Sequence, residues 1–175
     1  DISIPLVKLV NKGHERYWSI QDATANFGTS KIRLFLATGP SFQLGSDVDL
    51  DVAVDDLNLT RELITILPSK QQALWAKYQP LGRMDIHAKS VRRAGQWLTN
   101  ANATCEDISI ECERFRYPLT RCYGSVRFRE HQDLFVDLWA APDRSWKENP
   151  IHIVANIDRP GPDFTGAIEV RMRQD

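Results

Sequence analysis

The sequence has little of what several functional classes require. Its 175 residues contain 22 Lys and Arg against 23 Asp and Glu, so no surplus of positive charge favours nucleic-acid binding. No apolar run approaches the roughly 18 residues of a membrane helix, and no signal peptide is visible. We therefore expect any membrane anchor to lie outside this stretch. The 42% hydrophobic and 26% charged content is that of a globular chain.

Cysteine is also scarce, with only Cys105, Cys112 and Cys122 in the chain. The three lack CxxC spacing and no histidine adjoins them, so a zinc site is not indicated. We expect them to be small buried apolar residues, with a single disulfide as the alternative in an oxidising compartment. No cofactor is predicted.

The sequence also lacks a recognisable catalytic constellation. Its four histidines are isolated from one another, and no motif singles out a nucleophile with a base and an orienting group. Ser46 followed by Asp47 and Asp49 is similar to the Mg²⁺-binding signature of nucleotidyltransferases. In that family, however, a helical turn separates the serine from the carboxylates. We interpret these aspartates as a solvated acidic face and predict no catalytic residue, no metal ligand and no enzyme activity.

What the sequence does contain is alternation. In 47–55, DVDLDVAVD, Val48, Leu50 and Val52 alternate with acidic residues. The acidic residues are Asp47, Asp49, Asp51 and Asp55. A strand with one apolar and one acidic face is solvent-exposed on its acidic side, which favours an antiparallel sheet with an open face. We expect the aspartates to be solvent-exposed.

The same period of two predicts further strands. In 31–37, Ile32, Leu34 and Leu36 are expected on one face. The other expected strands are 2–10, 17–27, 82–93, 107–113, 151–157 and 167–173.

The stretch 115–141 predicts a hairpin. Val126 and Phe128 alternate with polar residues, and the alternation resumes after a short polar gap. Gly124 indicates a bulge or a close backbone approach. In the second strand, Trp139 is expected on the face opposite Leu138, in a core position. A ligand-stacking platform is the alternative for its ring.

Helices are predicted in one place only. Thr60 begins a short helix with Glu62 in its first turn, and Pro68 ends it. A second helix is expected from Ser69 to Tyr78, closed by Pro80.

Two stretches resemble a known family. The run YPLTRCYGSVRF at 117–128 is followed by a second alternating strand, and 52–93 combines a strand, a helical start, an LP break and a second helix around Trp75. Both are similar to repeat segments of AsmA-like proteins of diderm bacteria. The resemblance implies a periplasmic or cell-envelope location, membrane association and a part in lipid transport. Neither stretch carries a catalytic residue.

We therefore expect a β-dominated α+β fold, in which one or more curved antiparallel sheets carry an inserted helical pair. The chain is expected to be a single domain, 1–175, excised from a longer protein, with sub-units 1–94 (strands and helical pair) and 95–175 (a β-meander). One set of apolar residues is expected to form the groove or core face. This set is Val48, Leu50, Val52, Met84, Ile86, Ile108, Ile110, Val126, Phe128, Leu134, Val136, Leu138, Ile153, Ile168 and Val170.

The function expected from the resemblance is that of a non-enzymatic envelope segment with an apolar groove for lipid transfer or envelope maintenance. Its partners would be lipid acyl chains and neighbouring repeats of the same chain, with no nucleic acid. The first alternative is a structural or interaction module of a large surface protein. The second is the nucleotidyltransferase-like domain. A lipid groove requires an uncovered apolar face, whereas a structural module would close that face with its helices.

Overall fold

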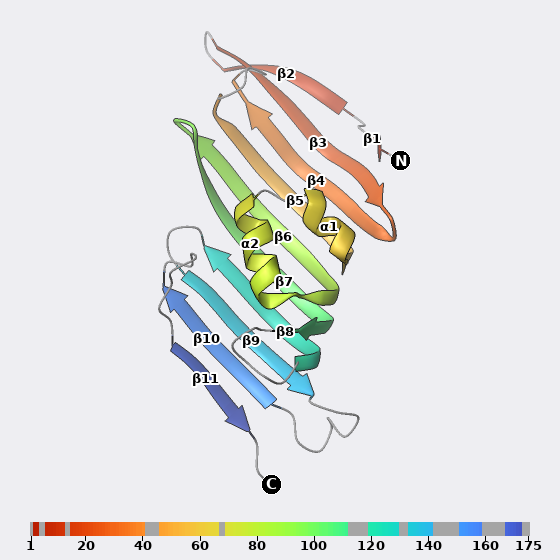
Figure 1. Ribbon diagram of the computed structural model, residues 1–175. Helices are drawn as coiled ribbons and strands as arrows, with labels where there is room; N and C mark the ends of the chain where they lie inside the picture. The colour runs from red at the N-terminus through yellow and green to blue at the C-terminus, as the bar shows by residue number, and fades with distance from the viewer. Residues whose placement is uncertain are drawn as a thin grey trace. The chain divides into compact units, whose positions relative to one another are not determined.

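The computed structural model describes residues 2–3, 6–12, 15–40, 46–66, 69–111, 119–129, 133–141, 151–158 and 167–172. Some residues discussed above lie outside this part. They are Cys112, Pro68, the polar hairpin connection and two of the four histidines, His14 and His131. The elements in chain order are β1 (Ile2–Ser3), β2 (Leu6–Lys12), β3 (Glu15–Phe27), β4 (Ser30–Gly39), β5 (Val48–Leu59), α1 (Arg61–Ile66), α2 (Ser69–Tyr78), β6 (Leu81–Arg93), β7 (Gln96–Ile110), β8 (Leu119–Arg129), β9 (Asp133–Ala141), β10 (Ile151–Asp158) and β11 (Ala167–Met172) (Figure 1).

The strands pair as a meander. Hydrogen-bonded neighbours follow chain order from β3 to β11, and both β1 and β2 pair with β3. The registers of β1 to β5 and of β9 to β11 are antiparallel, as short connections between consecutive strands require. The predicted β-dominated, antiparallel fold class is thus confirmed.

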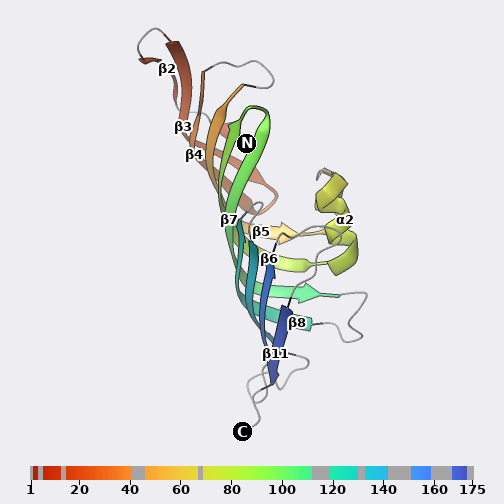
Figure 2. The same ribbon diagram turned by 90° about the vertical axis from the view of Figure 1, so that its left-hand side faces the viewer.

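The chain divides into two compact units, and β5, β6, β7 and β8 each have residues in both. Unit 1 is Asp1–Leu57, Asp85–Asn102 and Phe128–His131, and unit 2 is Asn58–Met84, Ala103–Arg127 and Gln132–Asp175. The turn between residues 94 and 95, where the sequence suggested a subdivision, lies inside unit 1. The strands within each unit twist and curve (Figure 2).

In unit 1, the register across β3, β4 and β5 sorts the side chains by face. Leu34 pairs with Ala23 on β3 and with Val52 on β5, and directly paired residues share a face. The same holds for the other apolar pairs. These residues form what we call the apolar face of unit 1: Ile20, Ala23, Ala25, Ile32, Leu34, Ala37, Leu50, Val52 and Val54.

A β-bulge in β4 changes one of the expected faces. The register shifts between Leu34 and Leu36, so that Leu36 pairs with Gln21 and Asp51 instead of joining the apolar face. The expectation that Ile32, Leu34 and Leu36 share one face is therefore wrong for Leu36. The physical reason is that a bulge inserts one unpaired residue, which reverses the alternation beyond it. Here the unpaired residue is Phe35, which is 40% exposed.

Unit 2 contains a covered core. In β9, Leu138 and Ala140 are buried, and they pair with Ile153 and Ile151 of β10 on the same face. Leu63 of α1 and Trp75 of α2 are also buried, and α2 lies over one face of the unit 2 strands (Figures 1 and 2). We infer that the helices cover the Leu138 face, since it is the buried one.

Local sequence explains where the helices of unit 2 begin and end. Thr60 precedes α1, its carbonyl accepts the Leu63 N–H at 3.1 Å, and a hydrogen bond from Thr60 lowers the pKa of Glu62. The second helix ends at Tyr78, and Gln79 takes a left-handed φ of 40° before Pro80.

Gly124 confirms the predicted close approach in the same unit. Its φ is 137°, and a Cβ there would collide with the Asp137 carbonyl oxygen. The β8 and β9 backbones therefore come together at a point that only glycine allows.

Candidate functional site

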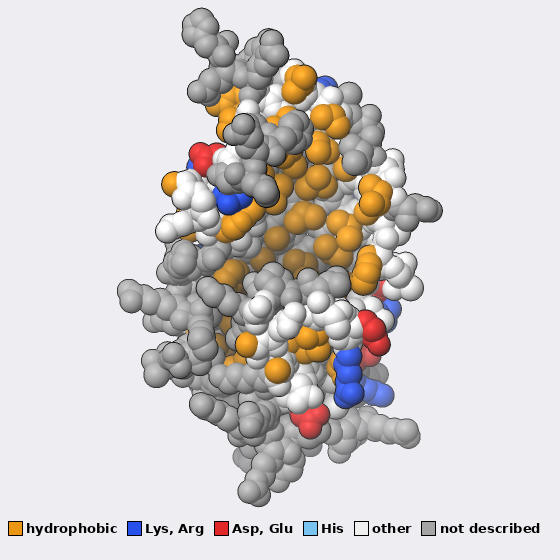
Figure 3. Space-filling view, turned by 45° about the horizontal axis from the view of Figure 1, so that its top comes forward, with side chains coloured by type: hydrophobic (Ala, Val, Ile, Leu, Met, Phe, Trp, Pro, Cys, Tyr) orange, Lys and Arg blue, Asp and Glu red, His pale blue; other side chains and the backbone are white. Residues whose placement is uncertain are grey.

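Apart from Trp18, which pairs with Gly39 on this face and is buried, the apolar face of unit 1 lacks large buried side chains. Among the described residues of this unit, the buried hydrophobic ones are Trp18, Ala23, Ala37 and Ala53. The large aliphatic residues, such as Leu34, Leu50 and Val52, are only half-buried. Figure 3 shows hydrophobic side chains gathered together and open to view. A folded sheet normally buries such a face against a second layer, whereas the described residues leave the large aliphatic side chains of this one half-buried.

Unit 2 provides an internal comparison. There Ile108, Leu138 and Ile157 are 3%, 3% and 6% exposed, respectively. The alternation in β9 resembles that in β5 in sequence, yet the two strands differ in burial. The two helices belong to unit 2, and we infer that they account for the difference.

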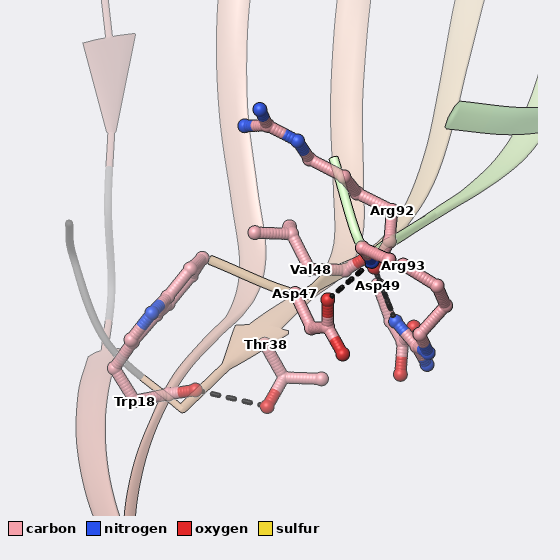
Figure 4. A network of polar contacts seen from close by, with 8 residues as sticks. Trp18, Thr38, Asp47, Val48, Asp49, Arg92 and Arg93 are labelled. Carbon is pink, nitrogen blue, oxygen red and sulfur yellow. Dashed lines mark hydrogen bonds and ion pairs between the residues drawn. The ribbon is translucent and has the colours of Figure 1, made fainter. Parts of the chain in front are cut away.

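The apolar face continues onto β6. Carboxylates on the polar face of β5 contact three residues of β6, His87, Lys89 and Arg93. Successive side chains of a strand point to opposite faces, so the even-numbered residues of β6 beside them point to the other side. These residues are Ile86, Ala88, Ser90 and Arg92. The side chains of Arg92 and Arg93 accordingly extend in different directions (Figure 4).

Strand β7 adds two residues to the same face. Ser90 hydrogen-bonds Thr99 at 3.0 Å between hydroxyl oxygens, and the Arg92 guanidinium lies 5.8 Å from the centre of the Trp97 ring. Both contacts cross the hairpin between β6 and β7. Trp97 is 39% exposed, so the end of the apolar face carries a cation beside an open aromatic ring.

The opposite face of unit 1 is a ladder of paired charges. Arg93 Nη2 lies 2.5 Å from Asp49 Oδ1, and Arg33 Nη2 lies 2.9 Å from Asp55 Oδ1. Asp51 Oδ1 is 2.6 Å from His87 Nε2, and its Oδ2 is 3.2 Å from Lys89 Nζ.

These contacts change the properties of the aspartates. Burial works to raise the pKa of Asp51, but the hydrogen bonds and charges of His87 and Lys89 outweigh it and lower that pKa. The Asp51 side chain is only 25% exposed. The aspartate side chains are therefore less exposed than expected, because cations of β4 and β6 cover them.

A small pocket opens on the charged face. Its volume is about 200 Å³, and it is lined by Tyr17, Thr38, Gly39, Pro40, Asp47, Asp49 and Arg93. Within it, Asp49 pairs with Arg93, and Asp47 Oδ1 accepts the Ala94 N–H at 3.1 Å (Figure 4). Both carboxylates suggested by the nucleotidyltransferase-like signature thus have protein donors. Among the described residues, no group of His, Cys, Asp and Glu side chains has the arrangement of a metal site.

The structure distributes the predicted groove residues between the two units. Val48, Leu50, Val52, Ile86 and Phe128 belong to unit 1, and all are half-buried. The unit 2 members are Met84, Ile108, Ile110, Val126, Leu134, Val136, Leu138 and Ile153, of which Ile108 and Leu138 are buried. Ile168 and Val170 lie in β11, and their side chains are outside the described part.

The sequence reasoning missed Arg92 and Trp97. The signal was present, because continuing the alternation of Ile86 and Ala88 along 82–93 leads to Arg92. It was missed because a charged residue does not count toward an apolar pattern.

Two cysteines confirm the expectation of burial. Cys105 and Cys122 are 3% and 0% exposed and carry free thiols. Burial raises the pKa of each to about 11, and the neighbouring Cys105 and Asp107 add to the effect at Cys122. Both thiols are thus protonated at neutral pH.

Comparisons with known proteins add no assignment: no family model, no curated protein and no solved structure matches this chain. Within the described residues, neither helix has the length and hydropathy needed to span a bilayer.

Proposed function

We propose that the apolar face of unit 1 binds lipid acyl chains, and that this chain is a non-enzymatic segment of an AsmA-like envelope protein. The single observation that supports the proposal is the half-burial of Leu34, Leu50 and Val52 on a face whose one large buried side chain, among the described residues, is Trp18. The periplasmic location and the inserted helical pair of 60–78 belong to the same proposal, through the sequence resemblance.

The energetics favour an apolar occupant over a polar one. Covering apolar surface contributes about 25 cal/mol per Å² removed from water, and each methylene buried contributes about 0.8 kcal/mol. A pleated apolar face has no fixed polar donors, so the affinity of a ligand for it depends mainly on the length of the ligand's apolar chain. We expect affinity to rise with the number of methylenes in the chain.

The neighbouring leucines of β4 supply a matched pair of variants. Leu34 is on the apolar face and Leu36 is on the charged face, although both are half-buried and on one strand. The test is a titration with a fluorescent 12-carbon fatty acid of the wild type, Leu34→Gln and Leu36→Gln. We expect Leu34→Gln to weaken binding at least about tenfold, and Leu36→Gln to bind as the wild type does.

Two results would contradict the proposal. If the wild type binds no acyl chain, the face serves another purpose, and the structural-module interpretation takes its place. If both variants lose the same affinity while their circular dichroism spectra match the wild type, the chain binds elsewhere.

A further inference from the structure

Arg92 lies at one end of the apolar face of unit 1. Its neighbour Arg93 reaches the Val48 carbonyl and the Asp49 carboxylate on the other side, which fixes Arg92 beside the first residues of β5. From there Leu50, Val52 and Val54 run along the face, over about 20 Å at roughly 3.3 Å per residue. The apolar face of unit 1 therefore has a charged residue at one end and apolar side chains along the rest of it.

The Arg92 side chain differs from Arg33 of β4 and from its neighbour Arg93 in its partners. Arg33 and Arg93 each pair with an aspartate on the charged face. Arg92 lies over the Trp97 ring at 5.8 Å, and its Nε is buried without a hydrogen-bond partner, as is the Nε of Arg33. Unlike Arg33, however, Arg92 has no carboxylate partner among the described residues. The positive charge of Arg92 is therefore not neutralised by a carboxylate of the described residues.

We propose that Arg92 anchors the anionic head group of an amphiphile whose acyl chain occupies the apolar face. This inference rests on the proposed function and adds the head-group class to it. A guanidinium offers donors in a planar fork that matches a carboxylate or a phosphate. Trp97, open beside it, suits the boundary between a chain and its polar head.

The charge arrangement supports an anion over a cation or a neutral group. Asp49, Asp51 and Asp55 of β5 pair with cations on the opposite face, so these three do not neutralise Arg92 on its own face. The partial screening of Arg92 from water strengthens a charge-assisted hydrogen bond to it.

The experiment compares head groups on one chain length. The probes are 1-monolauroylglycerol, whose head group is uncharged, 12-carbon lysophosphatidic acid and laurate, each kept below its aggregation concentration and titrated by displacement of a fluorescent fatty acid. Laurate and lysophosphatidic acid distinguish a carboxylate from a phosphate source. The proteins are the wild type, Arg92→Gln, Arg92→Lys and Arg93→Gln as the opposite-face control.

We expect the wild type to prefer an anionic head group over the uncharged glycerol head group by at least about tenfold, with a preference that falls as salt rises. Arg92→Gln should lower the affinities for laurate and lysophosphatidic acid to that for 1-monolauroylglycerol and so abolish the preference. Arg92→Lys should retain part of the preference for an anionic head group, and Arg93→Gln should retain all of it.

The two proposals fail in different ways. Binding of all chains without head-group preference, or a preference that survives Arg92→Gln, would overturn the anchor alone. If the wild type binds none of the probes, both proposals fall. If Arg92→Gln does not fold, the Arg92→Lys affinity and the salt series decide, and a salt-independent preference would count against the anchor.

Discussion

His87 Nε2 lies 2.6 Å from Asp51 Oδ1, and this contact joins β6 to β5 across the charged face of unit 1. The carboxylate also has Lys89 Nζ at 3.2 Å from its other oxygen. A single aspartate thus receives donors from alternate residues of one neighbouring strand, as cross-strand pairing on one face allows.

Asp51 should contribute to stability against acid. Although burial works against it, the donors lower its pKa in the folded state, so its contribution is present above the unfolded pKa and is lost as pH falls through the folded one. Asp51→Asn should cost about 1 kcal/mol or less at pH 7 and flatten the pH dependence below about pH 4. Urea unfolding from pH 7 to pH 2.5 measures this. A variant curve parallel to the wild-type curve over that range would contradict it.

Leu50→Ala and Leu138→Ala should differ in cost, although the substitution is the same. Leu138 is 3% exposed in the covered core of unit 2, so its truncation should leave a cavity and cost about 2–5 kcal/mol. Leu50 is half-buried on the open face, and its loss should cost about 1 kcal/mol. Urea denaturation gives both values, and equal costs would show that the face of Leu50 is sealed.

Gly124→Ala should destabilise more than Gly28→Ala. Both glycines have positive φ, 137° and 61°, but a Cβ at Gly28 meets open space while one at Gly124 collides with the Asp137 carbonyl. Gly28→Ala should cost about 1–2 kcal/mol for the left-handed backbone alone. In thermal unfolding, the Tm of Gly124→Ala should be well below that of Gly28→Ala. The reverse order would refute the close approach of β8 and β9.

The buried thiols should resist alkylation. With pKa values raised to about 11, Cys105 and Cys122 stay protonated at pH 8, and the thiolate is the reactive form. Iodoacetamide should modify them in urea and spare them in the native protein, as peptide mapping can show. The stability that their burial provides is present below their ordinary pKa and should be lost as the pH rises toward about 11. Equal labelling rates with and without urea would contradict the burial.

Much of the fold follows from local patterns. The alternation in 47–55 predicted both faces of β5 correctly, because a period of two assigns each residue to a side without tertiary information. The glycine at 124 predicted a close approach for a similar reason, since its backbone freedom is a local property.

Other features depend on partners that a sequence does not place. The bulge at Phe35 moved Leu36 to the charged face, and no residue type in 31–37 marks it. The half-burial of Asp51 depends on His87 and Lys89, which lie far along the chain. The exposure of Leu50 depends on which strands the helices cover, so the open face could not be assigned from the alternation of β5.

Native mass spectrometry of the protein purified from cells, with lipid extraction, tests the central claim most directly. Wild type and Leu36→Gln should carry adducts with the mass of acyl-chain lipids, enriched in anionic head groups, and Leu34→Gln should lose most of them. Wild-type protein free of lipid, or Leu34→Gln carrying as much lipid as the wild type, would contradict the assignment of the apolar face of unit 1 as a lipid-binding surface.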